Sequence, residues 1–432
     1  MYRNKNVKFL TLVLIFTMLF SVIPAYAQES DEPKGSLVLI GGALETDNAS
    51  IYNKFVELGG GIGKIKIAII PAASSTPNSS GDSIAKDFIS YGVPAESIKV
   101  FPLAVADDED TENVDELTWA KNGFSEELAK EISTYNAVFF IGGDQLLIIK
   151  ALVDEKGIDG TVLTEIRNIY KNGGVLAGTS AGTAIMTDPM IGSGTSIGAL
   201  TQGVTYKDNW GVVGDNRVFL TKGLGFMPNA ISDQHFLKRG RIGRLIVALF
   251  DQKINIGYGI DENTALVYKN KEVEVIGASG VIVVDISKAA KDPKNKNFSA
   301  AGIKLHYLES GDMFNTVTTQ ATVNKDKPTT SGIEYYTGNS LTTNILGIDT
   351  IKKVIADDLI DNTAKQAVGI SFDMENGSSI ANGTKFIFRK GEGTEGFWGK
   401  LNGIGSYSAV NVYLDIVPIK VRIISERVYR PR

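Results

Sequence analysis

The sequence predicts an α/β protein in which helices cover both faces of a parallel β-sheet. Between Ser36 and about Asp285, short apolar segments alternate with amphipathic ones. Continuous apolar segments are typical of strands buried on both faces, and the amphipathic segments between them are typical of the helices that bury them. Several apolar segments end in glycine turns, and ligands in such sheets bind beyond the carboxyl ends of the strands. The functional site is therefore expected at that edge.

Five apolar segments are expected to form the sheet. They comprise residues 36–42, 64–74, 97–103, 136–145 and 173–180. Three of them end in small residues, at Gly41-Gly42, Gly142-Gly143 and Gly178. The spacing of apolar positions predicts helices over residues 51–58 and from about 82 to 91.

Composition and charge narrow the class of protein. Of the 432 residues, 43% are hydrophobic and 22% are charged, which is a globular composition that allows a sizeable core. The formal net charge of -5 gives no reason to expect nucleic acid or an anionic membrane as a partner. Because the chain has no cysteine, disulfides, thiolate metal sites and a cysteine nucleophile are excluded. Metal-ligand spacing is also lacking, and we expect no metal or other cofactor.

The N-terminus has the pattern of a secretory signal peptide. Three basic residues among the first eight precede an apolar segment over residues 9–23, and Ala25-Tyr26-Ala27 supplies a small-x-small cleavage site. We expect cleavage after Ala27 and a secreted, extracellular protein with no stable membrane anchor. The alternative is an uncleaved anchor, but the apolar segment is short for a bilayer span.

Composition divides the rest of the chain into three parts. Residues 28–318 contain the alternating segments and are expected to form the main α/β domain. Residues 319–332 are polar and rich in threonine, which is typical of a linker. Residues 333–432 contain one helical and several strand-like segments, and predict a small α+β or β-rich module of unknown function.

A glycine-rich turn carries the first chemical signal. Gly178-Thr179-Ser180-Ala181-Gly182 matches G-x-S-x-G between an apolar strand and a helical segment, which is the context of a nucleophile elbow. The small residues allow a sharp turn that exposes the serine oxygen at a helix N-terminus, where backbone N–H groups favour negative charge. The alternative is a tight strand-to-helix turn that contains a serine by chance.

A serine nucleophile needs a general base, and the chain has two histidines. His306 lies in an alternating segment and has the pattern of a half-buried strand residue. His235 begins a basic helical segment, and Arg239, Arg241 and Arg244 follow it. Arginine binds carboxylates through two parallel hydrogen bonds, so this segment predicts a base beside an anion-binding corner. A solvated, basic helix start is the alternative.

The sequence also contains a series of longer motifs. In order along the chain they are FFIGGDQ, GTSAG, DQHFLKRGRIGRL, GIDENTALV and HYLESGDMF. Together they resemble the cyanophycinase branch of peptidase family S51, a family of serine peptidases that also includes aspartyl dipeptidase, from about residue 36 to 316. The resemblance implies a class-I-glutamine-amidotransferase-like (flavodoxin-like) fold, a serine–histidine pair supported by an acid, no metal, and a tendency to form homodimers.

The resemblance further implies a substrate and the residues that act on it. Cyanophycinases are exopeptidases that cleave cyanophycin, a poly-aspartate with arginine on each side chain, into β-aspartyl-arginine dipeptides. Ser180 matches the nucleophile and His235 the general base, while the N–H groups of Gly143 and Ala181 match the oxyanion hole. The positions that match substrate contacts are Gln145, Asp233, Gln234, Arg239 and Arg244.

The acid that orients His235 stays open between two residues. Spacing within the interval before His235 favours Asp215, although an insert over residues 191–216 makes that interval long. Resemblance to the dipeptidase branch suggests Glu262 instead. Asp188 is a weaker candidate because it is expected further along the helix after the elbow.

Three other functions stay open. A relative with the same catalytic residues could hydrolyse other aspartyl or isoaspartyl peptides. An α/β-hydrolase esterase shares the elbow but requires a histidine on a loop after the last strand, which His306 fits poorly. A non-catalytic, wall-associated binding protein would have no need of Ser180 and His235 within their flanking motifs.

Overall fold

The computed structural model describes residues 32–109, 111–373, 379–422 and 424. The predicted signal peptide, residues 1–27, lies outside these ranges, so its cleavage stays a prediction. None of the helices within the described ranges is long and apolar enough to span a bilayer.

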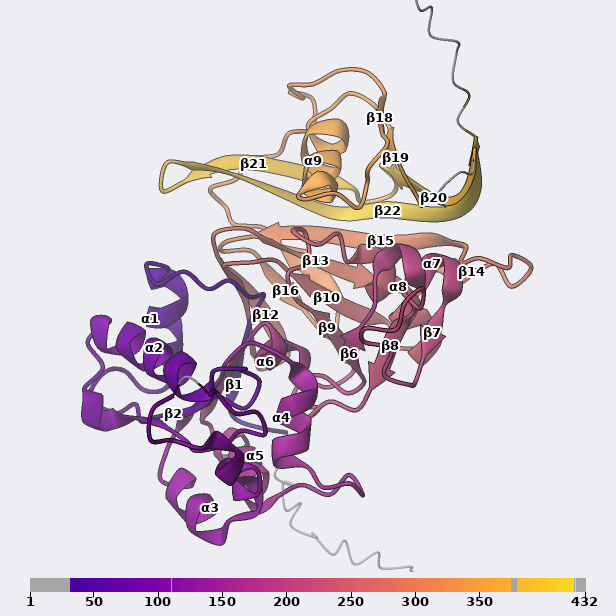
Figure 1. The fold of residues 1–432 in the computed structure, drawn as a ribbon. Helices are drawn as coiled ribbons and strands as arrows, with labels where there is room; N and C mark the ends of the chain where they lie inside the picture. The colour runs from indigo at the N-terminus through magenta and orange to yellow at the C-terminus, as the bar shows by residue number, and fades with distance from the viewer. Residues whose placement is uncertain (1–31, 110, 374–378, 423, 425–432) are drawn as a thin grey trace, which may run out of the picture. The chain divides into compact units, whose positions relative to one another are not determined.

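Five parallel strands form one end of the first sheet, in the order β1-β5-β4-β2-β3 with β3 at the edge. Their bounds are Ser36–Ile40 (β1), Ile67–Ile70 (β2), Ile98–Val100 (β3), Ala137–Phe140 (β4) and Val175–Thr179 (β5). Figure 1 labels β1 and β2 among the helices that surround this part of the sheet. Each strand lies inside one of the predicted segments, and the α/β fold class is confirmed. Four antiparallel strands continue the sheet beyond β1 and make it mixed, namely β11 (Thr264–Lys269), β12 (Glu272–Gly277), β16 (Met313–Asn315) and β17 (Gln320–Thr322).

Helices cover both faces of this sheet. They are α1 (Ala49–Leu58), α2 (Pro77–Ser90), α3 (Glu126–Ile132), α4 (Gln145–Leu152), α5 (Thr161–Lys171) and α6 (Ala181–Ala184), with short 3₁₀ turns at Ala95–Ser97, Glu116–Trp119 and Asn122–Phe124. Apolar residues of α1 and α2 pack with Val38 and Ile40 of β1 on one face. Residues of α3 to α6 pack with Leu37 and Leu39 on the other face. Successive strand residues point to opposite faces, so both helix layers require the uninterrupted apolar sequence of β1.

The second sheet follows the order β18-β19-β20-β22-β15-β13-β10-β9. Its strands are β9 (Ala230–Asp233), β10 (Ile256–Ile260), β13 (Gly280–Asp285), β15 (Ala300–Glu309), β18 (Ser340–Thr342), β19 (Gln366–Asp373), β20 (Ile380–Arg389) and β22 (Ile404–Arg422), with β14 (Ala290–Lys291) beside β15 and β21 (Glu395–Leu401) beside β22. The associated helices are α7 (Ser196–Gln202), α8 (Ile242–Gln252) and α9 (Thr350–Ile355), the last followed by a π-helical turn at Ala356–Ile360. A third, small sheet contains β6 (Met190–Ser193), β8 (Val218–Thr221) and β7 (Val204–Thr205).

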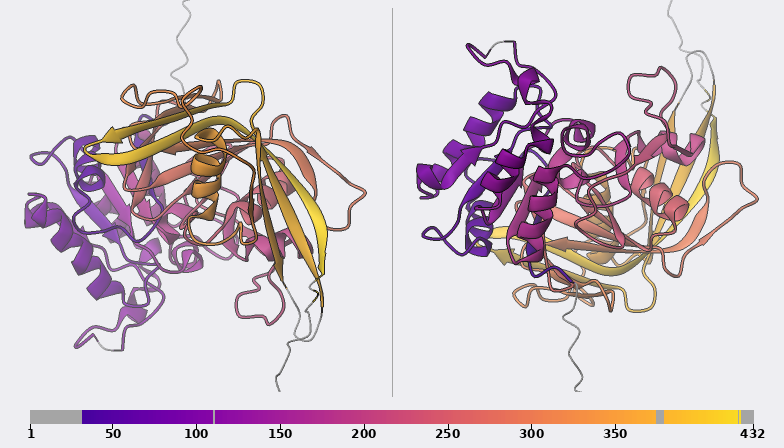
Figure 2. Two further views of the ribbon diagram at one scale, coloured as in Figure 1. Left: turned by 90° about the horizontal axis from the view of Figure 1, so that it is seen from above. Right: turned by 90° about the horizontal axis from the view of Figure 1, so that it is seen from below.

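The strand-rich C-terminal residues are built into the second sheet and form no separate module. β22 pairs along β15, and Figure 2 shows the yellow C-terminal strands running beside the orange ones. One hydrophobic core includes Leu245 of α8, Leu305 of β15, Ile351 of α9 and Leu414 of β22. Contacts group the chain from Pro33 onward into one unit. The boundaries predicted at residues 318 and 333 therefore correspond to no gap in the sheet or the core.

Residues 319–332, predicted as a linker, supply the lysine of a fully buried ion pair. Lys327 Nζ lies 2.6 Å from Asp312 Oδ1, and neither side chain is exposed. The same ammonium group donates to Ser408 Oγ of β22 at 2.6 Å. A polar, threonine-rich composition indicates exposure to solvent, but composition cannot show that one lysine has a buried carboxylate partner. This ion pair joins the predicted linker to the C-terminal strands.

We predict that Lys327→Met destabilises the protein by about 3 to 5 kcal/mol, because the Asp312 carboxylate stays buried without its partner. Urea unfolding followed by circular dichroism would measure the loss. Lys325→Met is the matched control, since Lys325 is exposed and makes no ion pair among the described residues. Equal unfolding midpoints for the two variants would show that the buried ion pair is not needed.

Candidate active site

Ser180 occupies the turn between β5 and α6, as the G-x-S-x-G pattern predicts. Its backbone has φ 53° and ψ −110°, a strained conformation that is typical of functional turns. The Ser180 N–H donates to the carbonyl of Ile40 at 3.0 Å. The Thr183 hydroxyl lies 2.6 Å from the carbonyl oxygens of Ile40 and Gly178. These contacts hold the strained turn against the end of β1.

The two glycines of the motif are required by close backbone packing. A Cβ at Gly178 would lie 2.0 Å from the carbonyl oxygen of Gly182. A Cβ at Gly182 would lie 2.5 Å from the carbonyl oxygen of Phe140 in β4. Real Cβ atoms do not approach oxygen this closely, so β5 and α6 can meet at this angle only when both positions lack a side chain.

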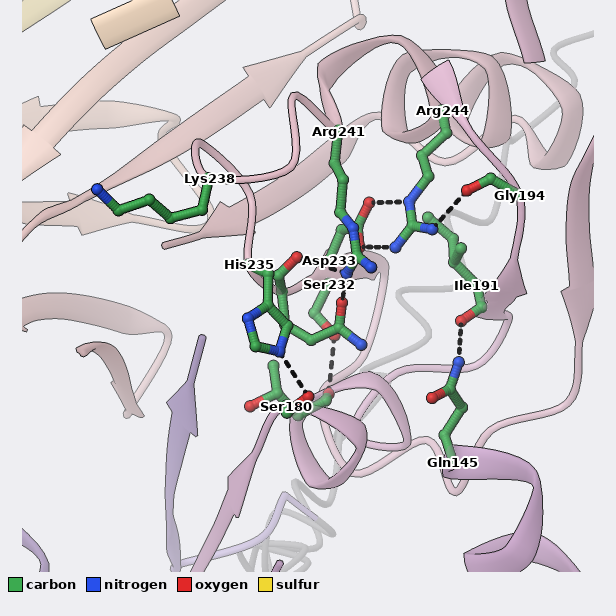
Figure 3. Close-up of polar contacts among 12 residues, drawn as sticks. Gln145, Ser180, Ile191, Gly194, Ser232, Asp233, His235, Lys238, Arg241 and Arg244 are labelled. Carbon is green, nitrogen blue, oxygen red and sulfur yellow. Dashed lines mark hydrogen bonds and ion pairs between the residues drawn. The ribbon is translucent and has the colours of Figure 1, made fainter. Parts of the chain in front are cut away.

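His235 follows β9 and links the serine to a carboxylate. Its Nε2 lies 2.8 Å from Ser180 Oγ (Figure 3). Its Nδ1 lies 2.6 Å from Glu262 Oε1. A carboxylate accepts hydrogen bonds, so Nδ1 carries the proton and Nε2 is free to accept from the serine hydroxyl. The three side chains form the hydrogen-bonded series of nucleophile, base and acid that serine hydrolases use.

The glycines after β1 make room for the imidazole, which sequence reasoning did not anticipate. A Cβ at Gly42 would lie 2.3 Å from Cε1 of His235. The His235 N–H donates to the carbonyl of Gly41 at 2.7 Å, with the histidine itself at φ 48°. The Gly-Gly signal in the sequence therefore marks the place where the ring of the base lies.

Burial lowers the pKa of His235 below its ordinary value of 6.5. The hydrogen bond to Glu262 acts in the opposite direction, while the positive charges of Arg239 and Arg241 lower the pKa further. The imidazole is therefore neutral at pH 7, which is the state in which it can accept a proton.

Asp261 is a second residue that sequence reasoning missed. Its Oδ1 accepts the N–H groups of Leu237 at 3.0 Å and of Lys238 at 3.1 Å, and its Oδ2 accepts from the Ser279 hydroxyl at 2.8 Å. Burial raises the pKa of Asp261. The carboxylate holds the turn that follows His235. The signal was its place beside Glu262 in the GIDENTALV motif.

The structure places Asp215 away from the imidazole. Its carboxylate binds the guanidinium of Arg217, at 2.9 and 2.6 Å, and also accepts from Asn209 at 3.2 Å. Asp188, the weaker candidate, accepts from the Gly223 N–H at 3.2 Å. Glu262 is thus the carboxylate that contacts His235. Counting residues could not identify it, because Glu262 reaches the ring from the end of β10 and not from the interval after Ser180.

Two backbone N–H groups beside Ser180 lack acceptors. Within the described ranges, neither Gly143 nor Ala181 donates a hydrogen bond from its main chain. Gly143 lines the same cavity as Ser180, and a Cβ at the preceding Gly142 would lie 3.2 Å from the serine Cβ. Ala181 is the first residue of α6. Both positions suit the oxyanion hole that the resemblance implies.

Asp233 and Arg244, both predicted to contact substrate, bind each other instead. Arg244 donates to Asp233 through Nε at 2.8 Å and through a terminal nitrogen at 2.6 Å, and its remaining nitrogen donates to the carbonyl of Gly194 at 2.8 Å (Figure 3). Both residues are buried. A buried carboxylate needs a paired cation, and this pair joins β9 to α8.

The other arginines differ from Arg244. Arg241 donates to the backbone carbonyl of Gln234 at 2.7 Å and to the side-chain oxygen of the same residue. Arg239 is exposed, and its guanidinium has no hydrogen-bond or ion-pair partner in the part of the chain that the structure describes. Arg239 is therefore the predicted substrate contact whose guanidinium is free.

Ser180 opens into a cavity of about 540 Å³. Gln145, the first residue of α4, lines it and donates through Nε2 to the carbonyls of Ile191 and Gly192 (Figure 3). The other charged and polar side chains around it are Ser75, Asp144, Ser193, Asp208, Gln234, Arg239, Arg241 and Arg244. This volume is typical of a site for a small molecule or the end of a chain.

His306 is buried in β15, its ring nitrogens have no partner among the described residues, and it packs edge-on against Phe314. It is a core residue, more deeply buried than its sequence pattern indicated. The described residues contain no group of three or more histidine, aspartate or glutamate side chains placed to bind a metal ion.

Comparison with known proteins identifies the family. The model for peptidase family S51 matches residues 37–276. Cyanophycinase of Synechococcus elongatus is 31% identical over 295 residues, which cover 66% of this chain and 81% of that protein. Cyanophycinase of Geminocystis herdmanii is 34% identical over 299 residues, which cover 66% of this chain and 96% of that protein. The chain belongs to peptidase family S51.

As a member of family S51, the protein is a serine-type peptidase. Ser180, His235 and Glu262 all lie within the matched residues, while most of the second sheet follows them. A solved structure of a peptidase from an acI-B1 Actinobacterium is also similar, with a TM-score of 0.42 and 20% identity over 68% of this chain and 96% of that one.

Replacing each of the two candidate acids by its amide provides a test of the triad. Glu262→Gln should lower kcat for peptide hydrolysis by about two to four orders of magnitude, because an amide no longer stabilises the imidazolium or selects its tautomer. Asp215→Asn should leave kcat near the wild-type value, since Asp215 contacts Arg217 and not His235. Steady-state kinetics would decide, and the reverse pattern would restore Asp215 as the acid.

The lowered pKa of His235 predicts the pH dependence of catalysis. The ratio kcat/KM should rise with pH through a midpoint below 6.5, as the imidazole of the free enzyme loses its proton. Arg239→Gln removes a positive charge that disfavours the imidazolium, so the midpoint should move to higher pH. Lys150→Gln, an exposed residue of α4, is the control that removes a charge elsewhere. An unmoved midpoint in Arg239→Gln would contradict this electrostatic coupling.

Proposed function

We propose that this S51 peptidase is a secreted serine exopeptidase that hydrolyses cyanophycin to β-aspartyl-arginine dipeptides. The observation that carries the proposal is the series of hydrogen bonds from Ser180 through His235 to Glu262. Ser180 lines a cavity that also contains the free guanidinium of Arg239. The relatives named as cyanophycinases support the substrate. A non-catalytic binding protein would not require this series of hydrogen bonds.

In the proposed mechanism, His235 Nε2 takes the hydroxyl proton as Ser180 Oγ attacks the scissile carbonyl carbon. The carboxylate of Glu262 stabilises the resulting imidazolium through Nδ1. The N–H groups of Gly143 and Ala181 receive the negative oxygen. His235 then gives its proton to the leaving amine. Water, deprotonated by the same imidazole, finally hydrolyses the acyl-serine and returns Ser180 to its free form.

Substrate recognition is assigned to the free guanidinium beside the nucleophile. Arg239 lines the cavity with Ser180 and can bind a carboxylate of the aspartate backbone through two parallel hydrogen bonds. Arg244 holds Asp233 and acts on the substrate only through the shape of the cavity. Because an arginine binds a carboxylate of any aspartyl chain, peptidase activity on other aspartyl or isoaspartyl peptides is the second candidate. Export and homodimer formation stay predictions.

The direct test is incubation of purified protein with insoluble cyanophycin. We expect soluble β-aspartyl-arginine, detected by mass spectrometry, and no product from Ser180→Ala, which removes only the nucleophilic oxygen. Free arginine as the first product would indicate a side-chain amidase. Cleavage of isoaspartyl dipeptides with no action on the polymer would favour the second candidate.

Arg239 and Arg244 make different contacts, so the same substitution at each position tests their separate roles. Arg239→Lys keeps the charge but loses the planar fork, which should cost about 1 to 3 kcal/mol of transition-state binding on a carboxylate substrate. An uncharged ester should be hydrolysed as before. Arg244→Lys should instead weaken activity on both substrates, because Asp233 loses its bidentate partner. Values of kcat/KM on both substrates would distinguish the roles, and equal losses in Arg239→Lys would assign it a structural role as well.

A further inference from the structure

One loop contributes an acidic and an aromatic side chain to the cavity that the arginines also line. Over residues 205–215 the chain presents Trp210, which is 82% exposed, and Asp208, and both line the same cavity as Ser180. The indole of Trp210 therefore offers an accessible aromatic face to a ligand in this cavity. Within the described ranges, Trp210 makes no ring contact with another aromatic or cationic side chain.

The loop is anchored by one buried residue, Asn209, which lies between Asp208 and Trp210. Asn209 is 6% exposed, and its oxygen accepts from the Ser193 hydroxyl of β6 at 2.7 Å. Its amide nitrogen donates to the carbonyl of Arg217 at 3.0 Å and to Asp215 Oδ1 at 3.2 Å. Asp215 therefore closes the base of the loop. Because the anchor ties the loop to β6, which also lines the cavity, the positions of Asp208 and Trp210 are set before a ligand arrives.

The carboxylate of Asp208 is available for a cation. One of its oxygens accepts the Trp210 N–H at 2.9 Å, and the other has no partner in the described part of the chain. Asp233, one of the positions that match substrate contacts, already holds Arg244. A planar guanidinium is bound best by a carboxylate at its edge and an aromatic ring on its face. Asp208 and Trp210 offer these two groups on one loop.

We propose that Asp208 and Trp210 form a subsite that binds the guanidinium of a substrate arginine. The inference rests on the proposed function and adds to it the residues that select the side chain of the polymer. The cavity then has two ends of opposite charge: Arg239 receives an aspartate carboxylate, while Asp208 and Trp210 receive the arginine attached to the chain. A substrate with both charges would be held at both ends, with its scissile bond at Ser180.

The test compares two substrates that differ in one charge. β-Aspartyl-arginine oligomers carry the guanidinium, and oligomers with citrulline in place of arginine carry a neutral urea of nearly the same shape. We expect wild-type protein to prefer the arginine substrate in kcat/KM. Asp208→Asn and Trp210→Ala should each lower kcat/KM on the arginine substrate by roughly threefold to thirtyfold. The citrulline substrate should change little, and Trp210→Phe should recover part of the preference.

Val213→Ala is the matched control, because Val213 is fully exposed on the same loop and does not line the cavity. An arginine-to-citrulline preference that is unchanged in Asp208→Asn and Trp210→Ala would overturn the subsite while leaving the proposed function intact. A selective loss in Asp144→Asn alone would move the cation site to α4 and would equally overturn it. If wild-type protein hydrolyses neither oligomer, the proposed function fails and the subsite fails with it.

Discussion

The end of β1 is the constraint on which the catalytic geometry depends, because three consecutive residues contact Ser180, His235 and the residue that follows Glu262. The carbonyl of Ile40 accepts the N–H of Ser180, and the carbonyl of Gly41 accepts the N–H of His235. Gly42 leaves room for the imidazole, and its carbonyl accepts from the residue after Glu262. β1 is buried between the two helix layers, so its position is fixed by the core. The strained turn at Ser180 is stabilised by this rigid support.

The arrangement of arginines separates structural charge from charge available to a ligand. Arg244 is buried against Asp233, where removal of either partner would leave an uncompensated charge. The guanidinium of Arg239 is exposed and unpaired among the described residues, and its positive charge lowers the pKa of His235. One side chain can therefore tune the base and bind the substrate. Substrate binding by Arg239 would reduce its effect on the imidazole, which links recognition to the proton affinity of the base.

The sequence predicted the elements that depend on local pattern, and it failed where distant segments meet. Apolar segments identified the five parallel strands of the first sheet, and the small residues around Ser180 identified the elbow. The acid that orients His235 was ambiguous, because Glu262 comes close to His235 only when β10 pairs with β9. Counting residues along the chain cannot show this pairing. The pairing of Asp233 with Arg244 was missed because it depends on how α8 packs against β9, which the sequence pattern does not show. The burial of Lys327 was not predicted either, because a polar composition indicates exposure to solvent unless the partner carboxylate is known.

The central claim is that Ser180 is the activated nucleophile, and covalent labelling tests it most directly. A fluorophosphonate reacts with a serine whose hydroxyl is activated by a neighbouring base, and peptide mass mapping locates the adduct. We expect one adduct, on Ser180, with labelling lost in His235→Ala and slowed as pH falls below the midpoint of His235. An adduct on a different serine, or an active enzyme that takes up no label at Ser180, would contradict the account.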